Sequence, residues 1–400
     1  MTIFFLTPRI PYPPYRGDKL KIWNLLRQLS KRHRIVLVSF IQSEREREYV
    51  SPLSEVCAEI HLVSLPRWKS FFNCVVAMFQ NIPFQVAYYR SREMRRVIDR
   101  VVNQTKPDLI HTHLIRMAQY TAHRKSYPRV LDMTDAVSLY LARLSGHHRN
   151  PVIRAIVGVE LKRMLSYESI IAQFDRTLVC SSNDRDVLLQ HIPLARIDLL
   201  YNGVDLETFS INGTLRPDPY RIILTGNMSY YPNADGAKFF VREIFPHIRQ
   251  QVPEAKLYIV GQDPPRSVKA LASDHVVITG FVPDIRLEYL KSAVAVSPIR
   301  FGAGTLNKIL EPLALGVPVV STSIGIDGLG LTMGEDILVA DKPQEFAQHV
   351  VQLLTNGQSR ERVAGSAAEK VRTRFSWDRL TRDLEQIYET IVNEQKNTES

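Results

Sequence analysis

The sequence contains few cysteines and no long hydrophobic run. Its 400 residues include three cysteines, Cys57, Cys74 and Cys180, which are widely spaced and form no CxxC pair. An odd, scattered set of this kind encodes neither a disulfide framework nor a zinc site, so we expect reduced thiols. The longest apolar stretches, residues 3–6 and 71–79, are far shorter than the roughly 20 residues that cross a bilayer. The sequence therefore predicts no membrane-spanning segment.

The N-terminus lacks the pattern of a signal peptide, because residues 1–20 have no basic region ahead of an apolar run that is itself too short. We therefore expect a cytoplasmic protein. Repeats of solenoid length and low-complexity tracts are missing as well. With 45% hydrophobic residues the chain has the composition of a globular protein, and its length predicts roughly two or three domains.

Positive charge is in excess. The chain has 51 Lys and Arg against 41 Asp and Glu, a formal net charge of +10. This excess predicts an anionic partner: a phosphorylated small molecule, an acidic lipid or a nucleic acid. The basic residues are scattered, with local clusters at 31–34 and 90–96, and do not form a stripe with interleaved aromatics. Nucleic acid is therefore the least favoured of the three.

Short apolar runs of strand length alternate with helical stretches, and the series occurs twice, before and after a turn-rich segment at 202–219. This alternation predicts parallel sheets with both faces covered. We therefore predict an α/β fold of two Rossmann-like, doubly wound domains with a boundary near residue 203. The expected strands are 2–7, 34–40, 59–65, 108–113, 129–133, 176–180, 220–225, 256–260, 275–279, 293–297, 317–321 and 336–340, and the expected helices include 19–32, 151–174, 234–251, 284–291, 305–315, 344–354 and 360–373.

Ligands of open α/β sheets bind beyond the carboxyl ends of the strands, so two facing domains would enclose a cleft. The loop at 8–18 follows the first expected strand and contains four prolines. Its residues Arg16, Gly17 and Asp18 open a helix whose free N–H groups can face an anion. The alternative is a rigid surface loop in which Asp18 is a simple N-cap.

The strand at 108–113 carries His111 and His113 on one face, because side chains two residues apart in a strand point the same way. A metal pair would need a third ligand, which the sequence does not reveal. Buried histidines without a ligand are the alternative. His113 lies nearest the strand end and is the better candidate to reach the cleft.

The loop at 226–233 begins with Gly226 and Asn227, directly after the first expected strand of the second domain. A glycine at this place lets the backbone approach a ligand closely. A plain turn between strand and helix is the alternative.

Residues 297–322 carry the strongest signal. Arg300 and Gly302 precede a small-residue loop that leads into a helix, which is a suitable cradle for a diphosphate. Lys308 adds a positive charge in the first turn, and Glu311, three residues on, points the same way. A surface ion pair between Lys308 and Glu311 is the alternative.

These residues resemble the retaining nucleotide-sugar glycosyltransferases of the GT-B fold, in family four of the glycosyltransferase classification. The resemblance covers most of the chain, and its most specific parts are NGVD at 202–205 and GAGTLNKILEPLALGVPVVST at 302–322. It implies that 1–203 is the acceptor-side domain, that 204–375 binds the nucleotide-sugar, and that 376–400 crosses back to the first domain. The site residues that it implies are Glu311 for the donor ribose, the backbone of Gly304, Thr305 and Leu306 for the diphosphate, His113 near the donor sugar, and Gly17 near the phosphate or acceptor.

The chain departs from the family pattern at two places. Ala303 stands where many members have a first glutamate, and the loop at 226–233 has Asn227 and Asn233 in place of Arg and Lys. We expect Lys308, with Arg300, to neutralise the diphosphate in their absence. No DxD motif is evident, so the resemblance implies metal-independent transfer without a cofactor.

The acceptor that the resemblance implies is a glycan or a lipid-linked molecule, in the synthesis of a cell-surface polysaccharide or glycolipid. Two alternatives stay open: a nucleotide-sugar epimerase of the same fold, and a non-catalytic module that binds nucleotide or lipid.

A hydrophobic stripe recurs at helical spacing in the first domain, flanked by Arg67 and Lys69. Packing against the domain's own sheet is the alternative to exposure. With the net charge and a lipid-linked acceptor in view, we predict that the stripe binds an anionic membrane peripherally, at the inner face of the cytoplasmic membrane. Its members are Trp68, Phe71, Phe72, Val75, Val76 and Phe79.

Overall fold

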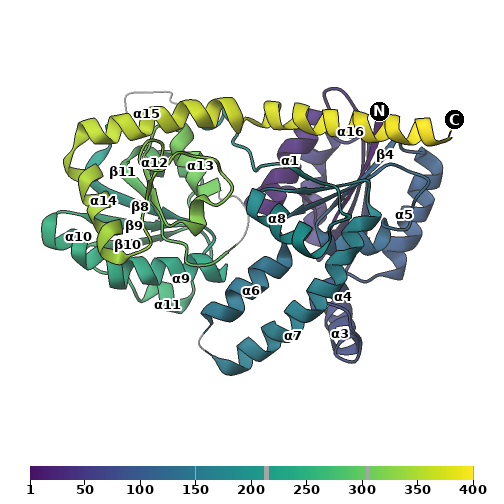
Figure 1. The fold of residues 1–400 in the computed structure, drawn as a ribbon, viewed down its shortest axis with the longest axis horizontal. Helices are drawn as coiled ribbons and strands as arrows, with labels where there is room; N and C mark the ends of the chain where they lie inside the picture. Colours follow the sequence, from purple (N-terminus) through teal and green to yellow (C-terminus); the bar gives the residue numbers. More distant parts are fainter. Residues whose placement is uncertain (149, 211–215, 303–306, 400) are drawn as a thin grey trace. The chain divides into compact units, whose positions relative to one another are not determined.

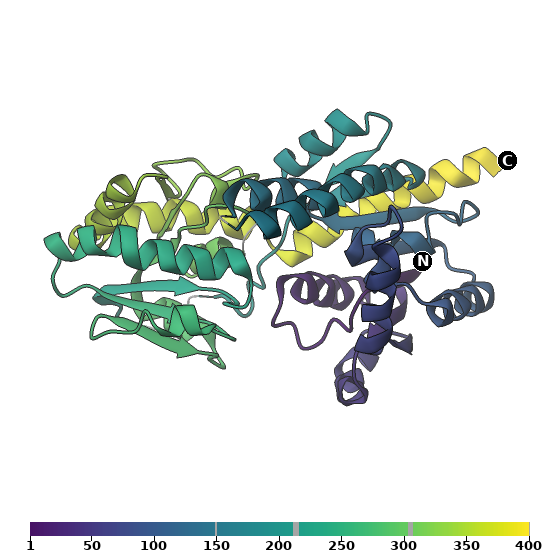
Figure 2. The ribbon, with the colours of Figure 1, turned by 90° about the horizontal axis from the view of Figure 1, so that it is seen from below.

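The computed structural model describes residues 1–148, 150–210, 216–302 and 307–399. The chain forms two compact units. Unit 1 contains Met1–Tyr201 and the chain from Leu380 onward, and unit 2 contains Asn202–Arg379. In each unit, helices cover both faces of a parallel sheet (Figures 1 and 2), which confirms the predicted pair of Rossmann-like domains.

Unit 1 is built on a seven-stranded sheet in the order β3-β2-β1-β4-β5-β6-β7. The strands are β1 (Thr2–Thr7), β2 (Arg34–Ile41), β3 (Glu59–Ser64), β4 (Leu109–His113), β5 (Arg129–Thr134), β6 (Arg176–Val179) and β7 (Ile197–Leu199). Phe5 of β1 pairs with Leu37 of β2 on one side and with His111 of β4 on the other. The sequence did not predict β7, because three residues give no measurable periodicity.

The helices of unit 1 connect these strands and leave the carboxyl ends of β1, β4 and β5 at one edge. The α-helices are α1 (Gly17–Leu29), α2 (Val50–Ser54), α3 (Arg67–Ala77), α4 (Phe84–Tyr88), α5 (Arg92–Thr105), α6 (Val137–His147), α7 (Pro151–Glu168), α8 (Ser182–His191) and α16 (Trp377–Glu399), and the 3-10 turns are η1 (Glu44–Tyr49), η2 (Ile115–Tyr120) and η3 (Ser169–Gln173).

The C-terminal helix α16 packs on unit 1 through both polar and apolar contacts. Glu385 accepts hydrogen bonds from Arg32 and His33, and Tyr388 bonds to His111 on β4. Leu384 and Tyr388 are fully buried. The last part of the chain therefore belongs to the first domain, as the resemblance implied.

Unit 2 has a six-stranded sheet in the order β10-β9-β8-β11-β12-β13. Its strands are β8 (Asp218–Thr225), β9 (Lys256–Val260), β10 (Val276–Gly280), β11 (Ser292–Ser297), β12 (Val319–Ser321) and β13 (Leu338–Val339). Its helices are α9 (Tyr231–Phe239), the π-helical turn η4 (Phe240–Ile244), α10 (Phe245–Gln251), α11 (Arg266–Lys269), α12 (Ile285–Leu290), α13 (Asn307–Ala314), the 3-10 turn η5 (Ile324–Ile326), α14 (Pro343–Thr355) and α15 (Gly357–Arg374).

The single helix expected at 234–251 is wrong in detail. A π-helical turn separates α9 from α10, and it ends just before Pro246. Proline has no N–H to donate to the preceding turn, so a wider turn at this point accommodates the missing hydrogen bond.

The three cysteines are in the state expected from the sequence. Cys57, Cys74 and Cys180 are free thiols. Within the described ranges, no helix combines the length and the apolar character that crossing a bilayer requires.

Candidate functional site

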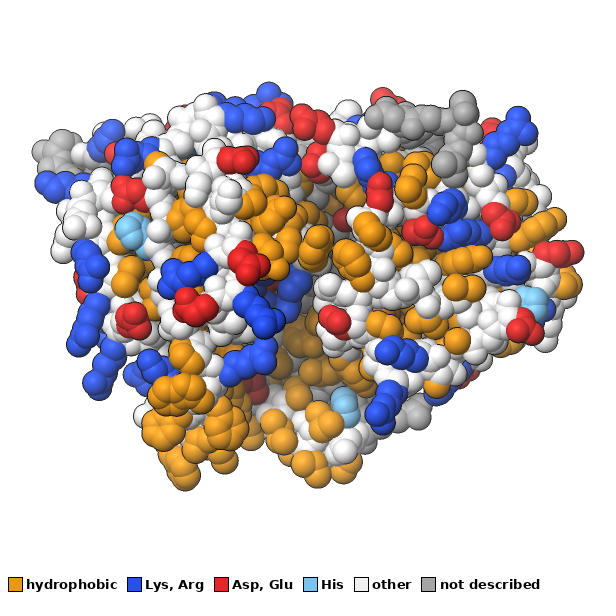
Figure 3. Space-filling view, turned by 180° about the vertical axis from the view of Figure 1, so that it is seen from behind, with side chains coloured by type: hydrophobic (Ala, Val, Ile, Leu, Met, Phe, Trp, Pro, Cys, Tyr) orange, Lys and Arg blue, Asp and Glu red, His pale blue; other side chains and the backbone are white. Residues whose placement is uncertain are grey.

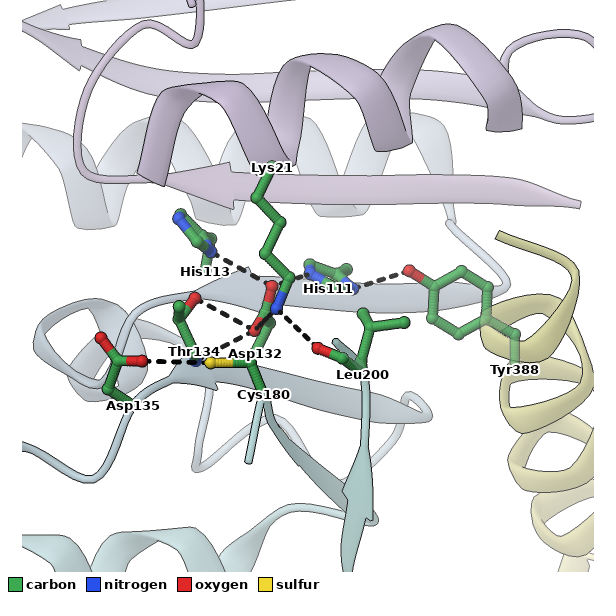
Figure 4. Close-up of polar contacts among 9 residues, drawn as sticks. All are labelled: Lys21, His111, His113, Asp132, Thr134, Asp135, Cys180, Leu200 and Tyr388. Carbon is green, nitrogen blue, oxygen red and sulfur yellow. Dashed lines mark hydrogen bonds and ion pairs between the residues drawn. The ribbon is translucent and has the colours of Figure 1, made fainter. Parts of the chain in front are cut away.

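The end of β4 in unit 1 lies in a buried polar network (Figure 4). Lys21 of α1 donates from Nζ to Asp132 Oδ1 of β5 at 2.8 Å, and to the carbonyl of Leu200 at 3.4 Å. The other carboxylate oxygen, Asp132 Oδ2, lies 3.4 Å from Nδ1 of His113. Lys21 of α1 thus positions Asp132, whose second oxygen lies beside the imidazole of His113.

Charges in this network are fixed by their surroundings. Although burial disfavours the ionised form of Asp132, Lys21 and the two histidines hold the pKa of its carboxyl well below the usual value. Burial lowers the pKa of His111 to about 3, so this imidazole is neutral near pH 7. Tyr388 Oη lies 2.7 Å from His111 Nδ1, and Phe5 stacks on the ring. The structure thus gives His111 a packing role that ties α16 to β4.

His113 is placed differently. It is 2% exposed, and no group in the described part of the chain forms a hydrogen bond with its Nε2. The residue that follows, Leu114, has φ +67°, and Thr134 at the end of β5 has φ +66°. Side chains with a Cβ rarely adopt this backbone conformation, and such strain gathers at functional sites. The choice of His113 over His111 as a ligand-facing residue stays a prediction.

The loop before α1 differs from the alternative that the sequence left open. Arg16 is the N-cap of α1 and makes no side-chain capping bond, whereas Asp18 lies inside the helix. Asp18 is therefore not the N-cap. It pairs with Arg9 at 3.4 Å and with Arg16 at 3.6 Å, and it interacts electrostatically with His113. A Cβ on Gly17 would meet no protein atom within 4 Å, so space is open there for a ligand.

In unit 2 the turn after β8 is fixed by two asparagines. Gly226 has φ +151°, and a Cβ at this position would lie 2.6 Å from Nδ2 of Asn233. The same Nδ2 donates to the carbonyl of Asn227 at 2.8 Å. Glycine is thus required at this turn for the packing of the protein itself.

Lys308 and Glu311 of α13 both have partners of their own, so the surface ion pair weighed from the sequence is not what they form. Lys308 Nζ donates to Asn233 Oδ1 at 2.5 Å, and Tyr289 Oη donates to Glu311 Oε2 at 3.3 Å. Burial lowers the pKa of Lys308 to about 7. Burial also raises the pKa of Glu311 to about 7, against the hydrogen bond from Tyr289. A cation and a carboxylate that both titrate near neutrality stand on one helix face.

Lys308 and Asn233 line a small hollow beyond the carboxyl ends of β8 and β11, together with Gly236 and Pro298. The structure therefore brings Gly226, Asn227 and Lys308 together around Asn233, which the sequence named only as a departure from the family pattern.

Arg300 has a partner that the sequence did not reveal. Its guanidinium makes two hydrogen bonds to Asp235, at 2.9 and 2.7 Å, and lies 4.7 Å from the ring centre of Phe239. Gly302 is described and has φ +156°. Gly304, Thr305 and Leu306, together with Ala303, lie outside the described residues.

Sequence reasoning missed Lys21, Asp132 and Tyr289. A signal existed for two of them, because a charged residue interrupts an apolar strand at Asp132 and an apolar helix face at Lys21. Tyr289 gave no such signal, since a tyrosine is ordinary at a buried position.

One group in the described ranges brings possible metal ligands together, namely Asp135, Cys180 and Asp184. Their atoms are engaged with one another and with the backbone: Cys180 Sγ donates to Asp135, and Asp184 accepts from the N–H of Ala136 at 2.9 Å. Burial, with the neighbouring charge of Asp184, raises the pKa of Asp135 to about 7. These hydrogen bonds connect the ends of β5 and β6 to the start of α8.

Comparison with family models gives two matches. Residues 22–208 match Glycosyltransferase Family 4, and residues 219–356 match Glycosyl transferases group 1. The chain is also 22% identical over 411 residues to an uncharacterized 44.6 kDa protein in the cps region of Klebsiella pneumoniae, which covers 98% of this chain and 99% of the relative.

Two solved structures with the same fold come from Thermosynechococcus elongatus and Anabaena. Sucrose-phosphate synthase from Thermosynechococcus elongatus superposes with a TM-score of 0.70 at 15% identity, over 98% of this chain and 99% of that one. HepE of Anabaena, in complex with UDP and glucose, superposes with a TM-score of 0.67 at 14% identity, over 98% and 100% of the two chains.

Proposed function

We propose that this chain, which belongs to the GT-B glycosyltransferases of family 4, transfers a sugar from a nucleotide-sugar to a glycan or lipid-linked acceptor with retention of configuration. The observation that carries the proposal is the pair Lys308 and Glu311, held on one face of α13 by Asn233 and Tyr289. A cation for a diphosphate and a carboxylate for a ribose are the two groups that a nucleotide-sugar requires.

Glu311 accepts hydrogen bonds from the ribose hydroxyls in this proposal, and Lys308 neutralises charge on the diphosphate as it leaves. Charge stabilisation by a fixed cation lowers the barrier because the negative charge grows in the transition state. Gly304, Thr305 and Leu306 are assigned to the same diphosphate through their backbone N–H groups. Arg300, which makes two hydrogen bonds to Asp235, is assigned to the donor site as well.

We propose that the acceptor oxygen attacks the anomeric carbon from the same face from which the leaving group departs. The bond from the acceptor oxygen to the anomeric carbon forms as the bond from that carbon to the diphosphate breaks. The acceptor's proton passes to the departing phosphate oxygen, so the products are a glycoside and a nucleoside diphosphate. No metal ion is required in this scheme, and His113 is assigned a hydrogen bond to the donor sugar.

The acceptor side of the proposal rests on unit 1. Arg16, Gly17 and Asp18 stand at the open start of α1, where Gly17 leaves space for a ligand. The relative in the cps region supports a place in the synthesis of a surface polysaccharide or glycolipid.

We further propose that the enzyme binds the inner face of the cytoplasmic membrane peripherally. The predicted stripe on α3 is exposed rather than packed on the sheet, with exposed fractions of 68% for Trp68 and 71% for Phe71. Figure 1 shows α3 projecting from the body of unit 1. An exposed aromatic helix flanked by Arg67 and Lys69 has the chemistry of an interfacial anchor.

The decisive experiment incubates the purified protein with radiolabelled UDP-, GDP- and ADP-sugars, with and without a membrane lipid extract. Label that moves to an extractable product only when the extract is present supports transfer. A converted nucleotide-sugar without any acceptor would instead identify an epimerase, and binding without turnover would identify a non-catalytic module.

A further inference from the structure

Unit 1 contains a cavity of about 520 Å³ whose lining includes four cations. Four basic side chains, Arg9, Arg16, Lys19 and Arg116, face a single lining carboxylate, Glu46. Asp18 stands beside the cavity and balances part of this charge by pairing with Arg9 and Arg16. Two positive charges are left in excess around one hollow.

The cations of this cavity are only partly satisfied within the protein. Arg9 donates to Tyr89 Oη at 2.9 Å, but the buried Nε of Arg116 has no hydrogen-bond partner in the described part of the chain. Burial lowers the pKa of Lys19 and that of Arg116, since both side chains give up solvent. Like charges gathered in a hollow repel one another unless an anion occupies it. The arrangement suits a phosphate or a diphosphate, which accepts several hydrogen bonds at once.

The outer wall of the cavity is apolar. Cys74 of α3 and Phe84 of α4 line it, and Cys74 Sγ contacts the carbonyl of Phe84 at 3.6 Å. Cys74 stands on the same helix as the exposed aromatic stripe. The helix that carries the exposed stripe therefore also contributes to the wall of the cationic cavity.

Helix α7 fixes this wall in place. Glu160 accepts from the N–H of Phe84 at 2.9 Å, and Arg163 donates to the carbonyl of Met78 at 3.1 Å. The guanidinium of Arg163 also lies 4.8 Å from the ring centre of Phe84. These contacts hold α4 and the end of α3 against α7.

Helix α7 is also apolar on its outer face, which was not predicted from the sequence. Val152 is 64% exposed, Ile156 56% and Val159 50%. No Asp or Glu occurs at 67–83, and the carboxylates of α7 are those of Glu160, bound to Phe84, and the buried Glu168. Figure 3 shows the apolar side chains gathered over these helices, with Lys and Arg close by. The surface is thus apolar and cationic, with no exposed carboxylate on α3 or α7.

We propose that this cavity binds the phosphate or diphosphate group of a lipid acceptor whose hydrocarbon chain lies along α3 and α7. A molecule with an anionic head and an apolar tail matches both halves of the surface. Arg9 and Arg16 of the cavity pair with Asp18, which also interacts electrostatically with His113, the residue assigned to the donor sugar. The inference rests on the proposed glycosyl transfer and names the class of acceptor.

The test measures direct binding to the full chain by titration calorimetry, without a nucleotide-sugar. The probes are geranyl diphosphate, which has both a tail and a head, and inorganic pyrophosphate, which has only the head. The double variant Arg16→Gln/Lys19→Gln removes two cavity cations whose side chains are partly exposed. Arg96→Gln/Arg100→Gln removes the same charge from exposed positions on α5 and serves as the matched control.

Geranyl diphosphate is expected to bind about tenfold more tightly than pyrophosphate, since its chain buries apolar surface. The cavity variant should weaken both probes by about tenfold or more, because two charge-assisted contacts are lost. The control should bind both as the wild type does. Phe72→Ser/Val76→Ser should remove the preference for the prenyl probe while leaving pyrophosphate binding unchanged.

Equal affinity for the two probes would overturn the proposal, because a free phosphate would then be the ligand. Binding that is lost in Lys308→Gln but kept in the cavity variant would also overturn it, since the probe would then occupy unit 2. UDP binding is measured in the same proteins. If the protein binds geranyl diphosphate in the cavity but binds no nucleotide, the proposed glycosyl transfer is refuted. The proposed ligand of the cavity is then still supported.

Discussion

Lys21 Nζ lies 2.8 Å from Asp132 Oδ1, and the two side chains are 1% and 0% exposed. This buried pair joins α1 to β5, and the other carboxylate oxygen of Asp132 lies 3.4 Å from Nδ1 of His113. Removing one member of a buried ion pair is destabilising, because the other charge is then left buried without a partner of opposite charge. The orientation of His113 therefore depends on a lysine that is far away in the sequence.

Lys21→Met should destabilise the protein by about 3–5 kcal/mol, because it leaves Asp132 ionised and buried without its cation. Lys21→Met/Asp132→Asn should recover a substantial part of that loss, since no uncompensated charge is left. Denaturant unfolding of the three proteins measures the difference. Equal stability of wild type and Lys21→Met would show that the pair carries no such role.

Glu311→Ala should weaken binding of UDP-glucose by roughly 1.5–3 kcal/mol for each charged hydrogen bond lost to the ribose. Glu335→Ala removes an exposed carboxylate of the same unit and is the matched control. Calorimetric titration of both variants checks the effect, and turnover is followed in parallel. Wild-type turnover in Glu311→Ala with an unchanged donor KM would refute the assignment.

Donor affinity should pass through a maximum near pH 7. Lys308 has a pKa lowered to about 7, so the cation that binds the diphosphate is present below pH 7 and is lost as the pH rises. Glu311 has a pKa raised to about 7, so the carboxylate that binds the ribose is present above pH 7 and is lost as the pH falls. UDP-glucose is a suitable probe because its diphosphate does not titrate in this range.

Single substitutions separate the two limbs of that profile. In Glu311→Gln the affinity should rise steadily as the pH falls through 7, and in Lys308→Gln it should rise as the pH increases. A maximum that persists in both variants would mean that other groups titrate.

Excess EDTA should leave the transfer rate unchanged, since Lys308 and backbone N–H groups stabilise the leaving diphosphate in our scheme. The measurement is the initial rate before and after chelation and dialysis. A rate that collapses with EDTA and returns with Mg²⁺ or Mn²⁺ would contradict the scheme and place a metal ion at the diphosphate.

Trp68→Ser/Phe72→Ser should float with anionic vesicles less than the wild type does. Added salt should reduce the flotation of the wild type. Leu194→Ser/Met333→Ser is the control, because Leu194 and Met333 are comparably exposed, at 87% and 62%, but lie elsewhere. Circular dichroism confirms that each variant is folded. Equal flotation of the wild type and both variants would show that α3 is not the contact.

The fold could be predicted from the sequence because its signals are local. Continuous apolar runs such as residues 2–7 mark strands of a parallel sheet wherever they occur, and β1 has those bounds. The break between α9 and α10 was missed although Pro246 is visible, because a proline does not tell whether the chain turns, bends or widens into a π-helical turn.

The sequence by itself determined the two Rossmann-like domains, the loops that follow their strands, and the pair Lys308 and Glu311 on one helix face. Only the tertiary structure decided which groups hold these residues, because contacts such as that of Glu311 with Tyr289 join segments that no periodicity relates. The same holds for the hydrophobic helices. Periodicity defines an apolar face, but whether a sheet covers that face depends on how the elements pack, and at α3 and α7 the face stays exposed.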